Sequence, residues 1–131
     1  MGIDDYLLTS TLHLIIGQRL VRKLCERCRE PYAPAADARR RFGLDLERSL
    51  TWYRPAGCPA CQGGYKGRTT IVEALPMTDA VRAKVLARCD AHQIEQVAIS
   101  AGMRTMFAHG IERVHAGLTT AEEVLRVTNL S

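Results

Sequence analysis

The chain has 131 residues, of which 47% are hydrophobic and 5% aromatic, so its length suits one ordinary domain or two small ones with a mainly aliphatic core. Its formal net charge of +4 is mild and is compatible with an anionic partner without requiring nucleic acid. Because the N-terminus is acidic and the longest apolar run near it, residues 12–16, is too short to span a bilayer, we expect neither a signal peptide nor a membrane span there.

The first third of the chain predicts a helix, a short strand and a loop. Apolar residues recur at helical spacing across residues 4–17, and Gly17 breaks that pattern. Residues 19–25 alternate apolar and basic side chains imperfectly, which indicates a short strand that leads into the first cysteine. Prolines mark residues 31–36 as a loop, and residues 36–42 predict one short exposed helix.

The middle of the chain is less regular. Residues 50–56 show neither the helical nor the strand spacing of apolar residues. The glycine-rich residues 57–68 are typical of turns. Residues 69–75, with the sequence TTIVEAL, are β-branched and apolar and predict a strand that Pro76 ends. The remainder predicts helices, which cover residues 79–89, 91–101, 104–116 and 119–127.

Capping residues support these helices. Thr78 or Asp79 can cap the helix that begins near residue 79. One threonine of residues 119–120 can cap the last helix, with one glutamate of residues 122–123 reaching back in a capping box. Helices dominate and the short strands surround the cysteines, so the predicted fold class is α+β: a mostly helical chain with a small tetracysteine zinc-binding subdomain.

Four of the five cysteines are the strongest chemical signal. Cys25 and Cys28 form one Cys-x-x-Cys pair, and Cys58 and Cys61 form a second pair after an excursion of residues 29–57. Each pair turns the backbone so that two sulfurs face one point, and two pairs supply the four soft ligands that a tetrahedral Zn²⁺ prefers. An all-sulfur set leaves no open position for water, which predicts a structural site rather than a catalytic one.

The residues alone leave further interpretations of the cysteines open. Iron can occupy the same four ligands as zinc. A thioredoxin-like redox pair would leave the second pair unexplained. Disulfides and unligated thiols stay open as well, although an odd cysteine count without a secretion signal favours a reducing compartment. Cys89 lies on an apolar helical face, and we expect it to be a small buried hydrophobe.

No other motif indicates catalysis. The sequence contains no P-loop, HExxH, GxSxG or GxGxxG pattern. The scattered histidines are expected to be surface or packing residues: His13, His92, His109 and His115. The segment GGYKGR carries Lys66 and Arg68 on a flexible backbone, and the arginine fork suits phosphate. On the residues alone, a structural or surface role for Arg68 is still the leading interpretation.

Several segments together resemble one protein family. They are QRLVRKLC, the two cysteine pairs, GYKGRT followed by an apolar strand, GMRT, and the closing GLTTAEEVLRVT. Nearly the whole chain is similar to the C-terminal third of the type II secretion and type IV pilus assembly ATPases. The tetracysteine insert and the segment IVEALPMTDA favour the type II secretion branch, and the pilus assembly branch is the alternative.

The resemblance implies a longer parent protein. That parent would be a hexameric, Mg²⁺-dependent ATPase on the cytoplasmic face of the inner membrane of a Gram-negative bacterium, where it powers pseudopilus assembly. Residues 1–24 would end its RecA-like motor core, residues 25–76 would form the tetracysteine metal-binding subdomain with short strands, and residues 77–131 a C-terminal helical subdomain. ATP and Mg²⁺ would bind only in the parent, so this chain alone should be inactive.

The same resemblance implies site residues and partners. It assigns structural Zn²⁺ to the four paired cysteines and places Arg68 near the nucleotide phosphates of the full motor. The implied partners are the preceding motor core, neighbouring subunits of a homohexamer and inner-membrane platform proteins, with no nucleic acid expected. A free-standing zinc-ribbon module that binds nucleic acid is the alternative from another class, although the few aromatic residues are not interleaved with the basic ones as stacking platforms would be.

Overall fold

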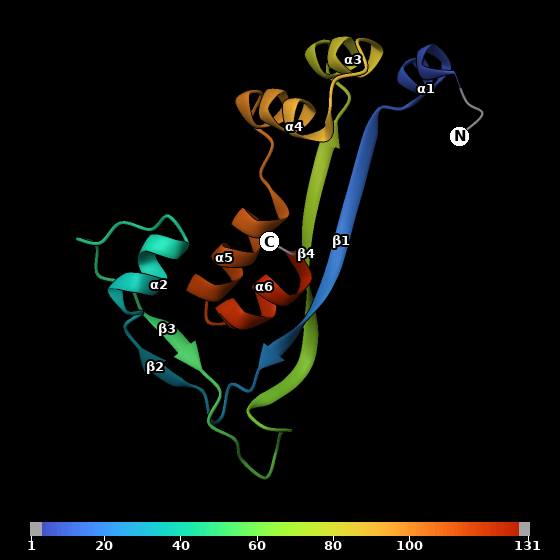
Figure 1. Cartoon of the computed structure of the whole chain (residues 1–131). Coiled ribbons are helices and arrows are strands. Elements are labelled where there is room, and N and C mark those ends of the chain that lie inside the picture. Colours follow the sequence, from blue (N-terminus) through green and yellow to red (C-terminus); the bar gives the residue numbers. More distant parts are fainter. Residues whose placement is uncertain (1–3, 129–131) are drawn as a thin grey trace. The chain divides into compact units, whose positions relative to one another are not determined.

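The computed structural model describes residues 4–128, and it combines helices with small sheets in the predicted α+β class (Figure 1). Its contacts divide the chain into two compact units, one of residues up to Gln18 with Val72–Met106, the other of Arg19–Ile71 with the residues from Phe107 on. The domain boundaries predicted after residues 24 and 76 stay a prediction. No helix within residues 4–128 combines the length and the apolar character needed to cross a membrane.

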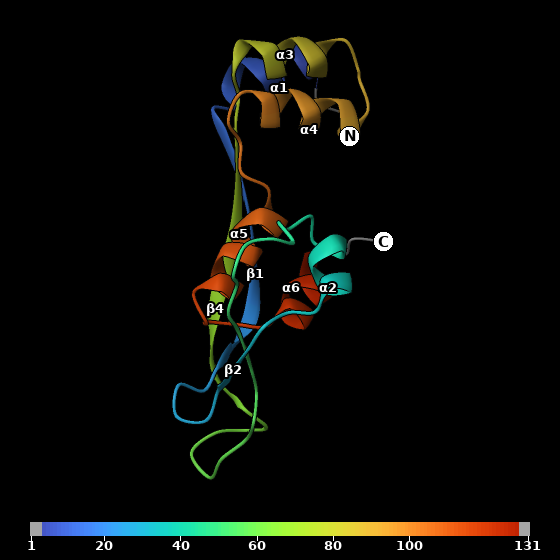
Figure 2. The same ribbon diagram turned by 90° about the vertical axis from the view of Figure 1, so that its left-hand side faces the viewer.

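The first unit is built on three helices. They are α1 (Asp5–Thr11), α3 (Asp79–Leu86) and α4 (Ala91–Ser100), and α3 packs against both of the others (Figure 2). Thr78 caps α3 as predicted, because its hydroxyl accepts the N–H of Val81 at 3.2 Å. Asp90 and Gln93 form a capping box at the start of α4. The buried centre of this unit consists of Met77, Val81 and Ala98.

The helix predicted over residues 4–17 is wrong in its second half. Helix α1 ends at Thr11, and β1 (Leu14–Leu24) follows and pairs with β4 (Tyr65–Pro76) in a two-stranded sheet. The hydroxyls of the last three residues of α1 bond back to carbonyls of the preceding turn, which weakens a helix at that point. The β-branched Ile15 and Ile16 favour the strand once β4 offers it backbone partners.

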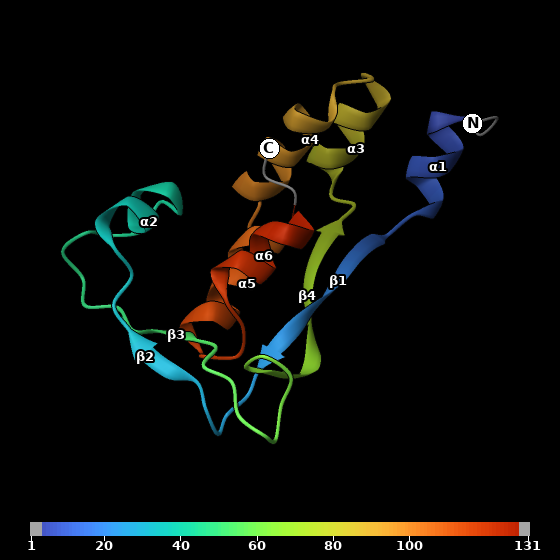
Figure 3. The same cartoon turned by 60° about the horizontal axis from the view of Figure 1, so that its bottom comes forward.

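The second unit holds the excursion between the cysteine pairs and the last two helices (Figure 3). Its further elements are β2 (Glu30–Tyr32), α2 (Ala36–Arg41), β3 (Trp52–Arg54), α5 (Met106–His115, whose first residue belongs to the other unit) and α6 (Ala121–Thr128). Strands β2 and β3 are antiparallel, with Tyr32 opposite Trp52. The segment of residues 50–56, which the sequence left unassigned, therefore contains a strand.

Trp52 is the centre of the second unit's core. Its side chain is 1% exposed and packs with Ile111, Val114, Ala121 and Val124 of α5 and α6. Helices α5 and α6 cross so closely that a Cβ atom on Gly110 would lie 2.5 Å from a methyl carbon of Val124. Trp52 thus joins the excursion between the cysteine pairs to the C-terminal helices through apolar packing.

Candidate metal centre and the basic pocket beside it

The first cysteine pair lies directly after β1 and is fixed by backbone hydrogen bonds. The N–H of Cys25 donates to the carbonyl of Gly64 at 2.9 Å. The N–H of Leu24 donates to the carbonyl of Leu118 at 2.8 Å. The N–H of Arg29 returns to the carbonyl of Cys25 at 3.1 Å and closes the turn of the pair. The pair is therefore held both by the segment before β4 and by the loop between α5 and α6.

The second pair is a tight turn of its own. The N–H of Cys61 donates to the carbonyl of Cys58 at 3.2 Å. The backbone then passes so close to Pro55 that a Cβ on Gly64 would lie 2.2 Å from the proline Cβ, and Gly64 has a φ of +97°. Both facts require glycine at this position, because any side chain would clash and the left-handed backbone disfavours one.

The two pairs meet at one point in space. The Sγ atoms of Cys25 and Cys58 are 3.8 Å apart, those of Cys28 and Cys61 are 3.7 Å apart, and those of Cys58 and Cys61 are 3.5 Å apart. All four sulfurs lie within 4.8 Å of one another, and all five cysteines of the chain are free thiols. Four thiolates at about 2.3 Å from a tetrahedral ion would be about 3.8 Å apart. The donor set and its spacing thus fit a metal ion.

The thiols of the second pair differ in acidity. Burial raises the pKa of Cys61, but its hydrogen bonds with the backbone of Cys58 and Gly64 and with the Cys58 thiol outweigh it and lower the pKa to about 7. A backbone hydrogen bond at Ala60 lowers the pKa of Cys58, but the neighbouring thiols and burial raise it to about 11. The Cys61 thiol is therefore the more readily ionised of these two, and metals bind the thiolate form.

Two side-chain contacts connect this centre to the C-terminal helices. The guanidinium of Arg29 donates to the carbonyl of Gly117 at 2.6 Å and lies 4.4 Å over the ring of Tyr53. The indole N–H of Trp52 donates to Nδ1 of His115 at 3.0 Å. Burial lowers the pKa of His115, and the nearby Arg48 lowers it further, so the ring stays neutral and can accept this bond.

A basic pocket of about 700 Å³ lies beside the second cysteine pair. Three cations line it: Arg22 of β1, and Lys66 and Arg68 of β4. Cys61 and Tyr65 belong to the same wall, and no acidic residue lines the pocket among the described residues. The structure therefore gives Arg68 two cationic neighbours and places it at the pocket that adjoins the sulfur cluster.

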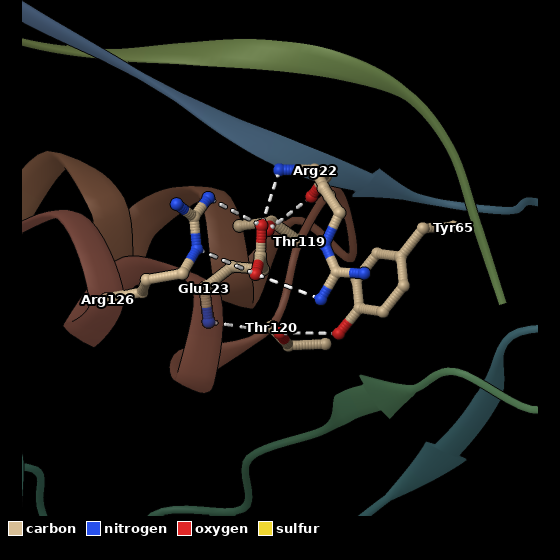
Figure 4. Close-up of polar contacts among 6 residues, drawn as sticks. All are labelled: Arg22, Tyr65, Thr119, Thr120, Glu123 and Arg126. Atoms are coloured by element: carbon tan, nitrogen blue, oxygen red, sulfur yellow. Dashed lines mark hydrogen bonds and ion pairs between the residues drawn. The ribbon is translucent and has the colours of Figure 1, made fainter. Parts of the chain in front are cut away.

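Glu123 of α6 is a buried carboxylate with a full set of donors (Figure 4). Its side chain is 3% exposed and accepts the backbone N–H of Arg22 at 2.7 Å. The guanidinium groups of Arg22 and Arg126 donate to it at 3.1–3.2 Å. Burial alone would raise the pKa of Glu123, but these hydrogen bonds lower it to about 2. The carboxylate is therefore ionised at neutral pH and fixes Arg22 from α6.

Arg22 is also held by its contact with Tyr65. Its guanidinium lies 4.1 Å over the Tyr65 ring, and the Tyr65 and Thr120 hydroxyls form a hydrogen bond at 3.0 Å (Figure 4). The hydroxyl of Thr119 donates to the carbonyl of Arg22 at 2.7 Å. Of the two predicted caps of α6, Thr120 accepts the N–H of Glu123 at 3.3 Å. The Glu123 carboxylate binds the arginines instead of completing a capping box.

Sequence reasoning singled out the cysteines and Arg68 but not Arg22 and Glu123. The cysteine pairs are recognisable from their local spacing. Arg22 and Glu123 are 101 residues apart, and no local pattern links them. Of the other predicted single residues, Cys89 is half-buried after the end of α3 rather than fully buried within a helical face.

Comparison with known proteins relates the chain to one family. Residues 1–126 match the family model described as "Type II/IV secretion system protein". The chain is 48% identical to "Type II secretion system protein E" of Xanthomonas campestris, covering 98% of this chain and 23% of that protein. It is 38% identical to "Type II secretion system ATPase E" of Vibrio cholerae (100% and 26% covered) and 36% identical to "Type IV pilus assembly ATPase PilB" of Thermus thermophilus (98% and 15% covered). The chain thus spans about a quarter or less of the length of these relatives.

Proposed function

The chain belongs to the family of type II/IV secretion system proteins, and we propose that it is the C-terminal, metal-binding part of a hexameric ATPase. That ATPase would power pseudopilus assembly in type II protein secretion. The observation that carries this proposal is the 48% identity to a type II secretion system protein E across 98% of the chain. Because the chain spans 23% of that relative, the motor core and its P-loop would lie in a longer protein, and the ATPase activity is proposed for that protein.

The cysteine cluster is proposed to bind structural Zn²⁺ through Cys25, Cys28, Cys58 and Cys61. Four sulfurs without a carboxylate or an imidazole suit zinc in a closed site. Binding would hold the turn before β4 in one shape, because Gly64 joins both the first cysteine and the start of that strand. Such a site contributes on the order of 10 kcal/mol of apparent binding free energy to folding.

Arg68 is proposed to approach the nucleotide phosphates in the longer protein. Its position in a cationic pocket supports this role, and its guanidinium offers the paired donors that phosphate oxygens accept. ATP and Mg²⁺ would be bound there mainly by the preceding RecA-like core. The further partners would be neighbouring subunits of the hexamer and the inner-membrane platform proteins, with the assembly at the cytoplasmic face of the inner membrane.

Metal content and ATP turnover test this proposal. We expect the longer protein that contains the chain to hydrolyse Mg-ATP, and the 131-residue chain to bind about one zinc ion per chain without hydrolysing ATP. Arg68→Ala in the longer protein should lower turnover and leave the zinc content unchanged, since Arg68 is not a ligand. ATP hydrolysis by the 131-residue chain at the rate of the longer protein, or purified reduced chain free of metal, would contradict the proposal.

The gene itself offers a second test. The reading frame upstream of Met1 should encode a P-loop about 120 to 200 residues earlier, from ordinary domain sizes. A reading frame that begins at Met1 would contradict a motor core in the same chain.

Type IV pilus assembly is the second candidate function, because two ATPases named PilB are 36% and 35% identical to the chain. Deletion of the gene separates the two branches. Loss of exoprotein secretion with intact surface pili supports the type II branch, whereas loss of pili with normal secretion supports the pilus branch.

A further inference from the structure

The pocket beside the cysteine cluster holds more positive charge than Arg68 alone supplies. Arg22, Lys66 and Arg68 line it, and the side chains of Lys66 and Arg68 have no hydrogen-bond or ion-pair partner among the described residues. No ion pair within residues 4–128 therefore neutralises either charge, although Lys66 also lines a second pocket that includes Glu26. The nearest carboxylate in the hydrogen-bond network, Glu123, is shared by Arg22 and Arg126. These four cations and one carboxylate carry a net charge of +3.

Arg22 is positioned before any ligand arrives. Its backbone N–H and the Nη2 atom of its guanidinium bind Glu123, and the plane of the guanidinium lies over the Tyr65 ring (Figure 4). The side chain nevertheless stays 56% exposed. An arginine fixed at one corner keeps its remaining N–H donors available and loses little rotamer freedom when a ligand binds.

The backbone of β4 brings Arg68 to the same pocket as Tyr65. Side chains three residues apart on a regular strand point to opposite faces. Gly67 lies between them with a φ of +78°, and a residue in this conformation interrupts the alternation as a glycine in a β-bulge does. Tyr65 and Arg68 consequently both line the pocket that Arg22 faces.

We propose that Arg22 and Lys66 form, together with Arg68, a binding site for a polyphosphate chain of the kind that a nucleoside triphosphate carries. The inference rests on the proposed function in one respect, since that function places Arg68 at the nucleotide phosphates. It adds two residues to that site and a reason for the buried Glu123, which holds Arg22 in place.

The shape and chemistry of the pocket favour a polyphosphate over other anions. A volume of about 700 Å³ is far larger than a single phosphate needs, and three separate cations suit a ligand whose charges are spread along a chain. The one aromatic ring among the lining residues, that of Tyr65, is already covered by Arg22 on one face. The site is therefore built to hold phosphates rather than to select a base.

Binding of inorganic tripolyphosphate to the 131-residue chain tests the proposal. Two-dimensional amide NMR at about 0.15 M salt keeps long-range attraction screened and reports the affected residues. We expect resonances of residues 65–68 to shift, and Arg22→Gln and Lys66→Gln each to weaken binding about fivefold or more, as loss of a charge-assisted hydrogen bond should. Arg41→Gln is the matched control, because Arg41 is an exposed arginine of α2 outside the pocket and loses the same charge.

Lys66→Gln keeps the test decisive if Arg22→Gln unfolds the chain, because the Lys66 side chain has no partner among the described residues whose loss would destabilise the fold. If Arg22→Gln and Lys66→Gln bind tripolyphosphate as Arg41→Gln does while Arg68→Gln binds it weakly, the inference is overturned and the proposed function stands. If the longer protein fails to hydrolyse ATP while the pocket variants still lose tripolyphosphate, the site is supported and the proposed function fails.

Discussion

Replacement of the buried Glu123 by glutamine should destabilise the second unit by about 2 to 3 kcal/mol at neutral pH. A pKa lowered from 4.5 to about 2 corresponds to about 3 kcal/mol of extra stability for the ionised form. The side chains of Arg22 and Arg126, which pair with Glu123, are each 56% exposed, so solvent screening reduces this free energy. Glutamine keeps the shape of the side chain but places an N–H₂ group against arginine donors.

The stability lost through Glu123→Gln should become smaller as the pH falls. Because the pKa of Glu123 is lower in the folded protein than in the unfolded chain, its contribution is complete above about pH 4.5 and disappears as the pH falls towards 2. The difference in unfolding free energy between wild type and Glu123→Gln should therefore shrink through this window. Any loss of bound metal in acid affects both proteins and cancels in the comparison.

Denaturant titration followed by tryptophan fluorescence measures this difference, since Trp52 is the only tryptophan and lies in the core of the second unit. Glu122→Gln is the matched control, because Glu122 is the exposed neighbour on the same helix and should cost less than about 0.5 kcal/mol. Equal losses for the two variants, or a Glu123→Gln loss that stays constant between pH 5 and about pH 2.5, would refute the electrostatic reasoning.

Three further predictions concern the metal centre and the core. Cys58→Ser should release the metal from the reduced chain, measured by elemental analysis, whereas Cys89→Ser should retain it. NMR titration of His115 should give a pKa below the ordinary value of 6.5, and stability should fall as the pH drops below 6.5, because burial and Arg48 disfavour the protonated ring; a value of 6.5 or above would contradict the Trp52 contact. Gly110→Ala should cost about 1 to 3 kcal/mol through its clash with Val124, and Val124→Ala in the same chain should lessen the penalty of the added methyl group.

Local signals explain what the sequence could predict. The caps at Thr78 and Thr120 and the apolar spacing of α3 to α6 act within a few residues, and the structure has helices near each predicted range. The same holds for α2 and for the strand that contains residues 69–75. The cysteine pairs are visible because a turn of four residues is enough to aim two sulfurs.

Contacts between residues far apart in the chain explain what the sequence could not predict. Residues 14–17 have apolar spacing that suits a helix, and only the pairing with β4 decides for the strand. Strand β3 is three residues long and depends on a partner strand that contains Pro31. The role of Glu123 depends on Arg22, far away along the chain, so local spacing alone assigns the glutamate to a helix cap.

Attachment of the first cysteine pair to the α5–α6 loop constrains the order in which the contacts of this unit can form during synthesis. Arg29 follows that pair, yet the carbonyl it binds, that of Gly117, is synthesised 88 residues later. Until that residue is made, the hydrogen bond that ties the turn after Cys28 to the α5–α6 loop cannot form. The first cysteine pair therefore reaches its final backbone support only when that distant loop is in place.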